Sequence, residues 1–156
     1  MNSIFSVRTF RAAVIGGLAT LAAGAIPTNA ATPDQAPPLA PGQSRVWFLR
    51  QLLPGENFHP PMIYVNGGPI AASAEGTTFY RDFSPGQYAF TVENCLPQAR
   101  SGQNMTLQPN SQYALQVVQD DNGAWDCNPP QVSYLRQVQP QQVPYLFSQV
   151  NYLGPR

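Results

Sequence analysis

Few side chains in this sequence could take part in acid–base or covalent chemistry. His59 is the only histidine among 156 residues, and it stands between Phe58 and Pro60 with no recognisable nucleophile motif beside it. A serine or cysteine nucleophile needs a positioned base, and nothing near His59 indicates one. The sequence therefore predicts a protein without catalytic residues and without a cofactor.

Cys95 and Cys127 are the only cysteines, and they predict a disulfide. Two cysteines in an oxidising compartment form a disulfide by default. Closing the loop from residue 95 to residue 127 would stabilise the fold by roughly 3–4 kcal/mol. The alternative is a redox or metal-binding thiol pair. A metal site normally needs three or four ligands, which one histidine cannot complete, and a c-type haem needs a Cys-x-x-Cys-His motif that is absent.

Three carboxylates, Asp120, Asp121 and Asp126, surround one predicted turn. Such a cluster could hold Ca²⁺ weakly, because Ca²⁺ prefers oxygen ligands. Its spacing matches no EF-hand loop, and Asp-Asp-Asn-Gly at 120–123 is equally good turn chemistry. We favour the turn and predict no metal.

The elements that position these residues are mostly strands, centred on residues 76–93. In the second half of this stretch Tyr88, Phe90 and Val92 alternate with polar or small residues, the pattern of a strand with one buried face. The turn chemistry of Ser-Pro-Gly at 84–86 predicts a reversal between two strands. We therefore expect a central hairpin here.

Other strands are expected at short intervals along the chain. The segment 45–53 is apolar on both faces, as in a central strand, and Asn-Gly-Gly at 66–68 predicts a second hairpin. Strands with turns between them predict an antiparallel β-sandwich over residues 44–139. The remaining expected strands are 104–108, 113–117 and 132–138.

The last segment, 140–156, has a helical pattern. Val143, Leu146, Phe147, Val150 and Leu153 form one apolar stripe, which predicts a short amphipathic helix. This tail is either a lid on the core or a docking element with aromatic anchors. If it docks a partner, truncation after Pro140 should abolish partner binding and leave the sandwich folded.

The first 30 residues have the parts of a cleavable signal peptide. Arg8 and Arg11 precede an apolar run at 12–26, and small residues lead to a cleavage point after Ala30. The 15-residue run is shorter than the roughly 20 residues that cross a bilayer. We expect a periplasmic or secreted mature chain with no membrane span of its own. It begins with a proline-rich leader, residues 31–43, which is either a spacer or an arm that lies along a partner.

The composition excludes some partners. There is no lysine, and removal of residues 1–30 leaves six scattered arginines against eight acidic residues, about −2 in formal charge. Nucleic-acid binding needs a cluster of cations, so it is excluded. Only 10% of residues are charged, and apolar and amide surface must therefore be exposed unless a partner covers it.

A series of short motifs follows the expected strands and turns: Tyr64–Gly67, Gly76–Phe79, Ser84–Tyr88, Leu107 and Pro109–Tyr113. Their order resembles a family of bacterial envelope proteins of unknown function. These proteins look like small immunoglobulin-like or transthyretin-like β-sandwiches and are often lipoproteins. The likeness covers residues 45–138, and this chain lacks the lipoprotein cysteine. The family has no assigned catalytic residues, so the resemblance implies none.

The whole precursor, a small chain rich in Gln and Pro with no cofactor motif, is also similar in size and style to another group. This is the small non-haem subunit of the quinohaemoprotein alcohol dehydrogenase complex of acetic acid bacteria. The resemblance implies an accessory subunit, held at the membrane through a larger enzyme subunit.

Three classes of function are compatible with these patterns. The first is a non-catalytic accessory subunit that stabilises or positions a larger periplasmic or membrane-bound enzyme. The second is a stand-alone ligand-binding sandwich for carbohydrate or peptide, with Trp47, Trp125 and tyrosines as stacking faces. Burial of Trp47 would remove one of the two tryptophans from such a site. The third is a hydrolase with an unrecognised site. We favour the first, with partner contacts at Pro37, Pro38, Tyr145, Phe147 and Tyr152.

Overall fold

Strand β1 (Ser44–Arg50) is the centre of the structure, and all seven of its residues are buried. It lies between β4 (Thr77–Phe83), which it pairs antiparallel, and β7 (Ser111–Asp120), which it pairs parallel. A strand with neighbours on both edges and layers on both faces must be apolar on both sides. The prediction of a central strand here is confirmed.

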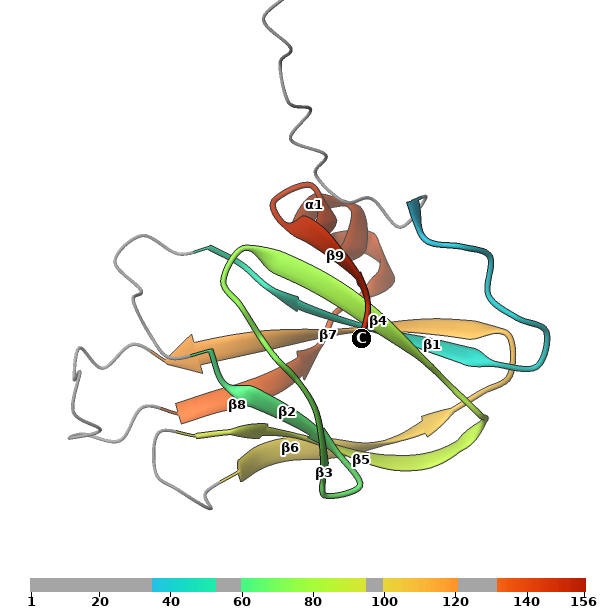
Figure 1. Ribbon diagram of the computed structural model, residues 1–156, viewed down its shortest axis with the longest axis horizontal. Helices are drawn as coiled ribbons and strands as arrows, with labels where there is room; N and C mark the ends of the chain where they lie inside the picture. Colours follow the sequence, from blue (N-terminus) through green and yellow to red (C-terminus); the bar gives the residue numbers. More distant parts are fainter. Residues whose placement is uncertain (1–34, 53–59, 95–99, 121–131) are drawn as a thin grey trace, which may run out of the picture.

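The computed structural model describes residues 35–52, 60–94, 100–120 and 132–156. In these residues two sheets pack face to face, with strand orders β8-β7-β1-β4-β9 and β3-β2-β5-β6 (Figure 1). The all-β sandwich predicted from the sequence is confirmed. The other strands are β2 (Met62–Val65), β3 (Gly68–Ala72), β5 (Gly86–Glu93), β6 (Arg100–Leu107), β8 (Val132–Gln137) and β9 (Asn151–Pro155).

The prediction of a purely antiparallel sandwich is wrong for the five-stranded sheet. The pairs β1–β7 and β4–β9 are parallel, whereas every pair in the four-stranded sheet is antiparallel. Alternation along a sequence identifies the buried face of a strand but carries no information about its neighbour or direction. Parallel pairing joins distant segments here, with Ser44 opposite Ser111.

The expected central hairpin is also wrong. The chain does reverse at 84–86, but β4 pairs with β1 and β9, whereas β5 pairs with β2 and β6. The turn is therefore a corner between the two sheets. The second expected hairpin is confirmed: β2 and β3 pair around Asn66 and Gly67, which both have positive φ, as a two-residue type I′ turn requires.

Alternate residues of β1 belong to two different cores. Val46 and Phe48 face the four-stranded sheet and join the core of the sandwich. Trp47 and Leu49 face outward and are covered by the C-terminal tail, which forms a third layer on the five-stranded sheet (Figure 1). The second core also contains Tyr80, Ala114, Val138, Leu146 and Phe147.

The tail is only partly helical. A 3₁₀ turn, η2 (Pro140–Gln142), leads into the five-residue helix α1 (Val143–Phe147), with Pro144 in its first turn, where proline is tolerated. The expected continuation of the helical stripe to Leu153 is wrong, because residues 151–155 form β9 against β4. Backbone hydrogen bonds to an open sheet edge replace those of a helix, and Leu153 is exposed.

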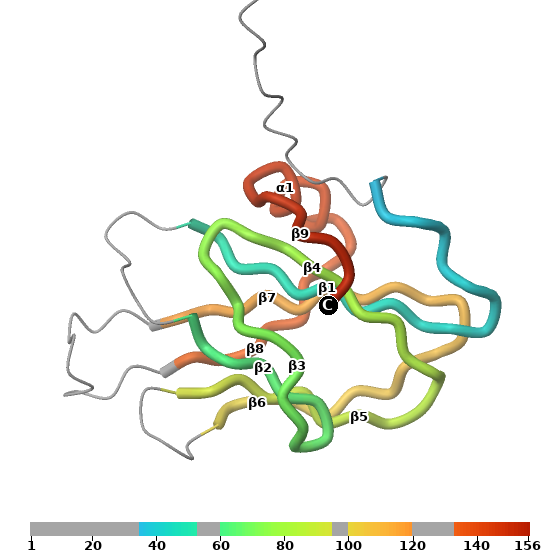
Figure 2. The backbone as a smooth tube through the Cα atoms, in the orientation of Figure 1, coloured from blue at the N-terminus to red at the C-terminus, as the bar shows by residue number. Residues whose placement is uncertain are grey.

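The leader also lies on the domain, from residue 35 onward. Figure 2 shows this segment arching around one end of the sandwich before it enters β1. Ala36 packs against the second core, and the backbone N–H of Gly42 donates to Asn110 Oδ1 at 2.8 Å. The described part of the leader is therefore an arm held by its own domain.

Candidate functional site

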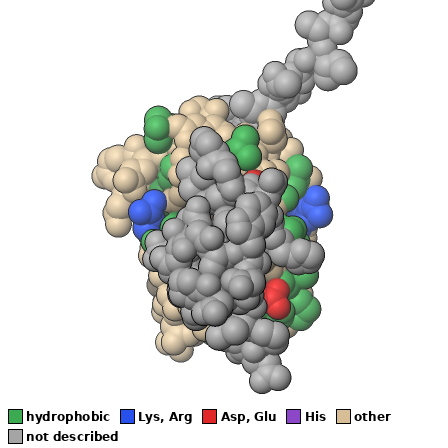
Figure 3. Space-filling model, turned by 90° about the vertical axis from the view of Figure 1, so that its left-hand side faces the viewer, with side chains coloured by type: hydrophobic (Ala, Val, Ile, Leu, Met, Phe, Trp, Pro, Cys, Tyr) green, Lys and Arg blue, Asp and Glu red, His purple; other side chains and the backbone are tan. Residues whose placement is uncertain are grey.

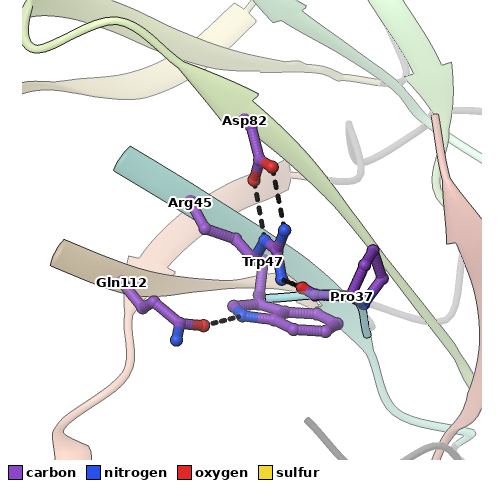
Figure 4. Close-up of polar contacts among 5 residues, drawn as sticks. All are labelled: Pro37, Arg45, Trp47, Asp82 and Gln112. Atoms are coloured by element: carbon purple, nitrogen blue, oxygen red, sulfur yellow. Dashed lines mark hydrogen bonds and ion pairs between the residues drawn. The ribbon is translucent and has the colours of Figure 1, made fainter. Parts of the chain in front are cut away.

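On the outer face of the five-stranded sheet, polar side chains of β1, β4 and β7 contact one another and the arm (Figure 4). Arg45 donates from Nε and Nη2 to the two carboxylate oxygens of Asp82, at 2.7 and 2.8 Å. Its Nη1 donates to the carbonyl of Pro37 at 2.7 Å, and its guanidinium lies 3.9 Å from the ring centroid of Tyr80. Planar, bidentate pairing of this kind suits arginine. Arg45 thus joins the arm, β1 and β4.

The bonds to Asp82 also raise the pKa of Arg45 above its ordinary value. The guanidinium therefore stays charged although its side chain is only 3% exposed. A buried charge needs such a partner, because desolvation without compensation is costly. The hydrogen bonds of this arginine join β1 to β4 and to the arm of the same domain.

Trp47 lies beneath the tail and is 3% exposed. Its Nε1–H donates to Gln112 Oε1 at 2.9 Å, and its ring meets Phe147 edge-on at 5.1 Å between centroids. Tyr80 and Tyr152 pack on it at 5.0 and 5.9 Å. A buried indole offers no stacking face to a sugar, so the carbohydrate alternative loses Trp47.

Tyr152 joins this cluster from β9. Its ring stacks on that of Tyr80 at 6.0 Å and an interplanar angle of 12°. Burial, together with a hydrogen bond to Tyr80, raises the pKa of Tyr152 to about 12. Its hydroxyl is therefore neutral at ordinary pH, and its ring is half-buried rather than open to a partner.

The five predicted contact residues differ in exposure: three are exposed, Phe147 is buried and Tyr152 is half-buried. Tyr145 is 66% exposed, and Pro37 and Pro38 are exposed on the arm. Phe147 is 1% exposed, so its assignment as a surface contact is wrong. Its place in the apolar stripe of the tail was itself a signal for burial. The structure brings Pro37 and Tyr152 to one cluster, through Arg45 and Tyr80.

In the described residues, the exposed large apolar side chains belong to the tail or to the segment that follows β1. They are Leu52, Tyr145 and Leu153. Leu52 follows Gln51, whose Nε2 donates to Gln149 Oε1 of the tail at 2.5 Å. Figure 3 shows basic and acidic side chains only as isolated patches on the described surface of the face that it draws. We call Leu52, Tyr145 and Leu153 the tail patch.

A groove of about 360 Å³ opens beside the tail. Trp47 lines it together with the beginning of β7, the end of β8 and the link to α1, and no lining residue is charged. A second hollow of about 330 Å³ lies over β5 and β6 and is also uncharged. The groove is lined by Trp47, Gln112, Tyr113, Ala114, Gln137, Val138, Gln139, Pro140 and Val143.

Other arginines of the described chain also make internal contacts. Arg50 is buried and donates from Nη2 to Glu75 at 2.9 Å. Arg100 lies 3.5 Å from the ring centroid of Tyr64, and Arg136 donates to Gln116 Oε1 at 2.5 Å. Each of these contacts joins an arginine to another part of the sandwich. The described residues contain no group of three or more His, Cys, Asp or Glu side chains that could hold a metal.

Several predicted residues lie outside the described part of the chain. These are His59, Cys95, Cys127, Asp121, Asp126 and Trp125, and for Asp120 only the backbone is described. The disulfide therefore remains a prediction, and the preference for turn chemistry over a calcium site is untested.

The comparisons assign no family. No protein-family model matches this sequence, and a search of curated proteins found no match. In the described ranges, no helix combines the length and the apolar character needed to cross a membrane.

Proposed function

We propose that this protein is a non-catalytic periplasmic accessory subunit that stabilises or positions a larger membrane-associated enzyme. The observation that carries the proposal is the tail patch: Leu52, Tyr145 and Leu153 are 67%, 66% and 41% exposed and belong to the tail or to the strand end bonded to it. Exposed large apolar side chains are candidates for a protein interface, because the fully buried core of an interface is more apolar than the rest of the surface.

The contacts of the charged residues also support this proposal. Arg45, Asp82, Arg50 and Glu75 are engaged in ion pairs within the domain. A surface poor in charge suits burial against another protein, because desolvating amides and apolar groups costs less than desolvating charges. The proposed partner is an oxidoreductase subunit of the quinohaemoprotein alcohol dehydrogenase kind, and the proposed location rests on the signal-like segment 1–30.

We propose further that the sandwich is of the transthyretin-like type. In an immunoglobulin constant-type sandwich the first, second, fourth and fifth strands share one sheet. Here β1 and β4 lie in one sheet and β2 and β5 in the other, and β1 pairs with β7 in parallel. This order favours the transthyretin-like alternative of the resemblance over the immunoglobulin-like one.

The test is affinity purification of the mature chain from detergent-solubilised envelopes of its source, followed by mass spectrometry. We expect one large enzyme to co-elute in stoichiometric amount. Tyr145→Ala should weaken this co-elution, whereas Gln87→Ala, an exposed change on the four-stranded sheet, should leave it unchanged. Elution of the wild-type chain without a partner would contradict the proposal.

A further inference from the structure

The groove beside the tail contains an unpaired edge of β7. Pairing between β7 and β8 ends at Leu115 opposite Gln137, although β7 begins four residues earlier, at Ser111. The last contact between the two segments is the backbone N–H of Val138, which donates to the Ala114 carbonyl at 2.9 Å. Beyond it the chain leaves β7 and enters η2. Residues 111–113 have no strand partner on this side in the described chain.

The direction of the free backbone groups follows from the strand geometry. The Ala114 carbonyl points toward β8, because Val138 donates to it. Residues two apart in a strand present their backbone groups to the same side. The N–H and carbonyl of Gln112 therefore point into the space that β8 leaves, where the groove lies. Unpaired edge groups are templates for an added strand.

The walls of the groove suit an uncharged ligand. Pro140 and Val143 provide apolar surface, whereas Trp47, which is 3% exposed, contributes only a small part of the lining. The side chains of Gln137 and Gln139 are exposed, and neither has a hydrogen-bond partner in the described chain. Amide groups can donate and accept, so they satisfy backbone groups of either polarity. A charged ligand would find no counter-charge among the lining residues.

The molecule already contains one contact of this kind. Figure 4 shows Pro37 at one edge of the Trp47 indole and Gln112 at the other. On the first edge lies the arm, an uncharged segment, with Ala36 packed against the second core and the Pro37 carbonyl bonded to Arg45. The groove offers the same aromatic ring on its other edge, with amides in place of the arginine.

We infer that the groove binds an uncharged, extended peptide segment, which adds as a short strand along residues 111–113 of β7. Main-chain hydrogen bonds to Gln112 supply affinity, and an apolar side chain of the segment packs against Pro140 and Val143. The assignment of this segment to the enzyme partner rests on the proposed function. The binding of an uncharged peptide in the groove is independent of that function.

The probe is the capped pentapeptide Gln-Thr-Val-Thr-Gln, titrated into the ¹⁵N-labelled mature protein and followed by NMR. We expect saturable shifts at the Gln112 amide and the Trp47 indole N–H. At a peptide concentration ten times the Kd, hydrogen exchange of the Gln112 amide should slow about tenfold. The same peptide N-methylated at valine lacks one strand donor and should bind at least about tenfold more weakly.

Two variants locate the site. Ala114→Leu fills the floor of the groove, and Gln139→Glu places a charge in it at an exposed position that does not threaten the fold. Each should weaken peptide binding about tenfold, whereas the matched change Gln87→Glu, in the hollow over β5 and β6, should not. Shifts confined to that hollow, equal binding of the N-methylated peptide, or no saturable change at millimolar peptide would overturn the inference.

The enzyme co-elution assay separates this inference from the proposed function. If Gln139→Glu and Ala114→Leu both retain the enzyme at wild-type levels, the groove is not where the partner binds, and that part of the inference fails while the accessory function stands. If the pentapeptide binds as expected but no enzyme co-elutes with the wild-type chain, the peptide site stands and the accessory function fails.

Discussion

The two aromatic residues of α1 allow the lid and docking roles of the tail to be separated. Phe147 is 1% exposed and meets Trp47 edge-on, whereas Tyr145, on the same short helix, is 66% exposed. Truncating a buried Phe to Ala costs about 3–5 kcal/mol, through lost transfer energy and the cavity that remains. We expect Phe147→Ala to lower the free energy of unfolding by about 4 kcal/mol, a large fraction of the 5–15 kcal/mol typical of a domain.

Tyr145→Ala is the matched control, because it removes an aromatic ring from the surface. Its effect on the free energy of unfolding should stay within about 0.5 kcal/mol, while its effect on partner binding should be large. The assay is urea unfolding of the mature chain, followed by circular dichroism and tryptophan fluorescence. If Phe147→Ala unfolds within about 1 kcal/mol of the wild type, the tail does not seal a second core.

The same contacts reverse the expectation for truncation after Pro140. That truncation removes Leu146, Phe147 and Val150, which are 6%, 1% and 2% exposed, and β9 with them. At about 1.5–3 kcal/mol for each buried apolar side chain, the loss is roughly 5–9 kcal/mol. We expect a largely unfolded chain, detectable by circular dichroism; a folded truncated chain would show that the tail is dispensable.

Three further changes test the framework by urea unfolding. Asp82→Asn leaves the buried guanidinium of Arg45 without its counter-charge and should lower the free energy of unfolding by about 2 kcal/mol. It should also make the arm accessible to protease. If neither quantity changes, the ion pair stabilises neither the fold nor the arm. Gly102→Ala would place a Cβ 2.0 Å from the Phe90 carbonyl oxygen, a backbone atom, and should cost at least about 3 kcal/mol; an unchanged midpoint would contradict that geometry. The pKa of Tyr152 is raised from 10.0 to about 12, so the folded state keeps a proton that the unfolded state loses. Stability should therefore fall as pH rises from about 10 to 12, and Tyr152→Phe should flatten this dependence; equal slopes would contradict the assignment.

Much of the local structure can be predicted from the sequence. The two apolar faces of β1 indicate a central strand, and Asn66 with Gly67 forms the hairpin turn that its residue types require. The pairing order cannot be predicted in this way. The turn at 84–86 has the same chemistry whether its strands pair with each other or cross between sheets, and only contacts with β1 and β2 decide between the two.

The candidate site was less accessible to sequence reasoning. Arg45 and Asp82 meet because they are direct partners in the β1–β4 register, and residues 37 positions apart carry no local sign of that pairing. The contact between Trp47 and Gln112 depends in the same way on the parallel pair β1–β7. Burial of Phe147, by contrast, could have been predicted, because Phe147 lies in the apolar stripe of the tail.

The parallel pair β1–β7 has a consequence for how the chain folds. A polypeptide is made from its N-terminus, so β1 emerges with seven residues that must be buried, long before its partner at Ser111–Gln116 exists. Closing this long loop has an entropic cost that must be met before the pairing can offset it, which slows folding. Once β4 has been made it can pair with one edge of β1, but the other edge stays open until β7 follows. We therefore expect a nascent chain that ends before β7 to bind holding chaperones or to aggregate.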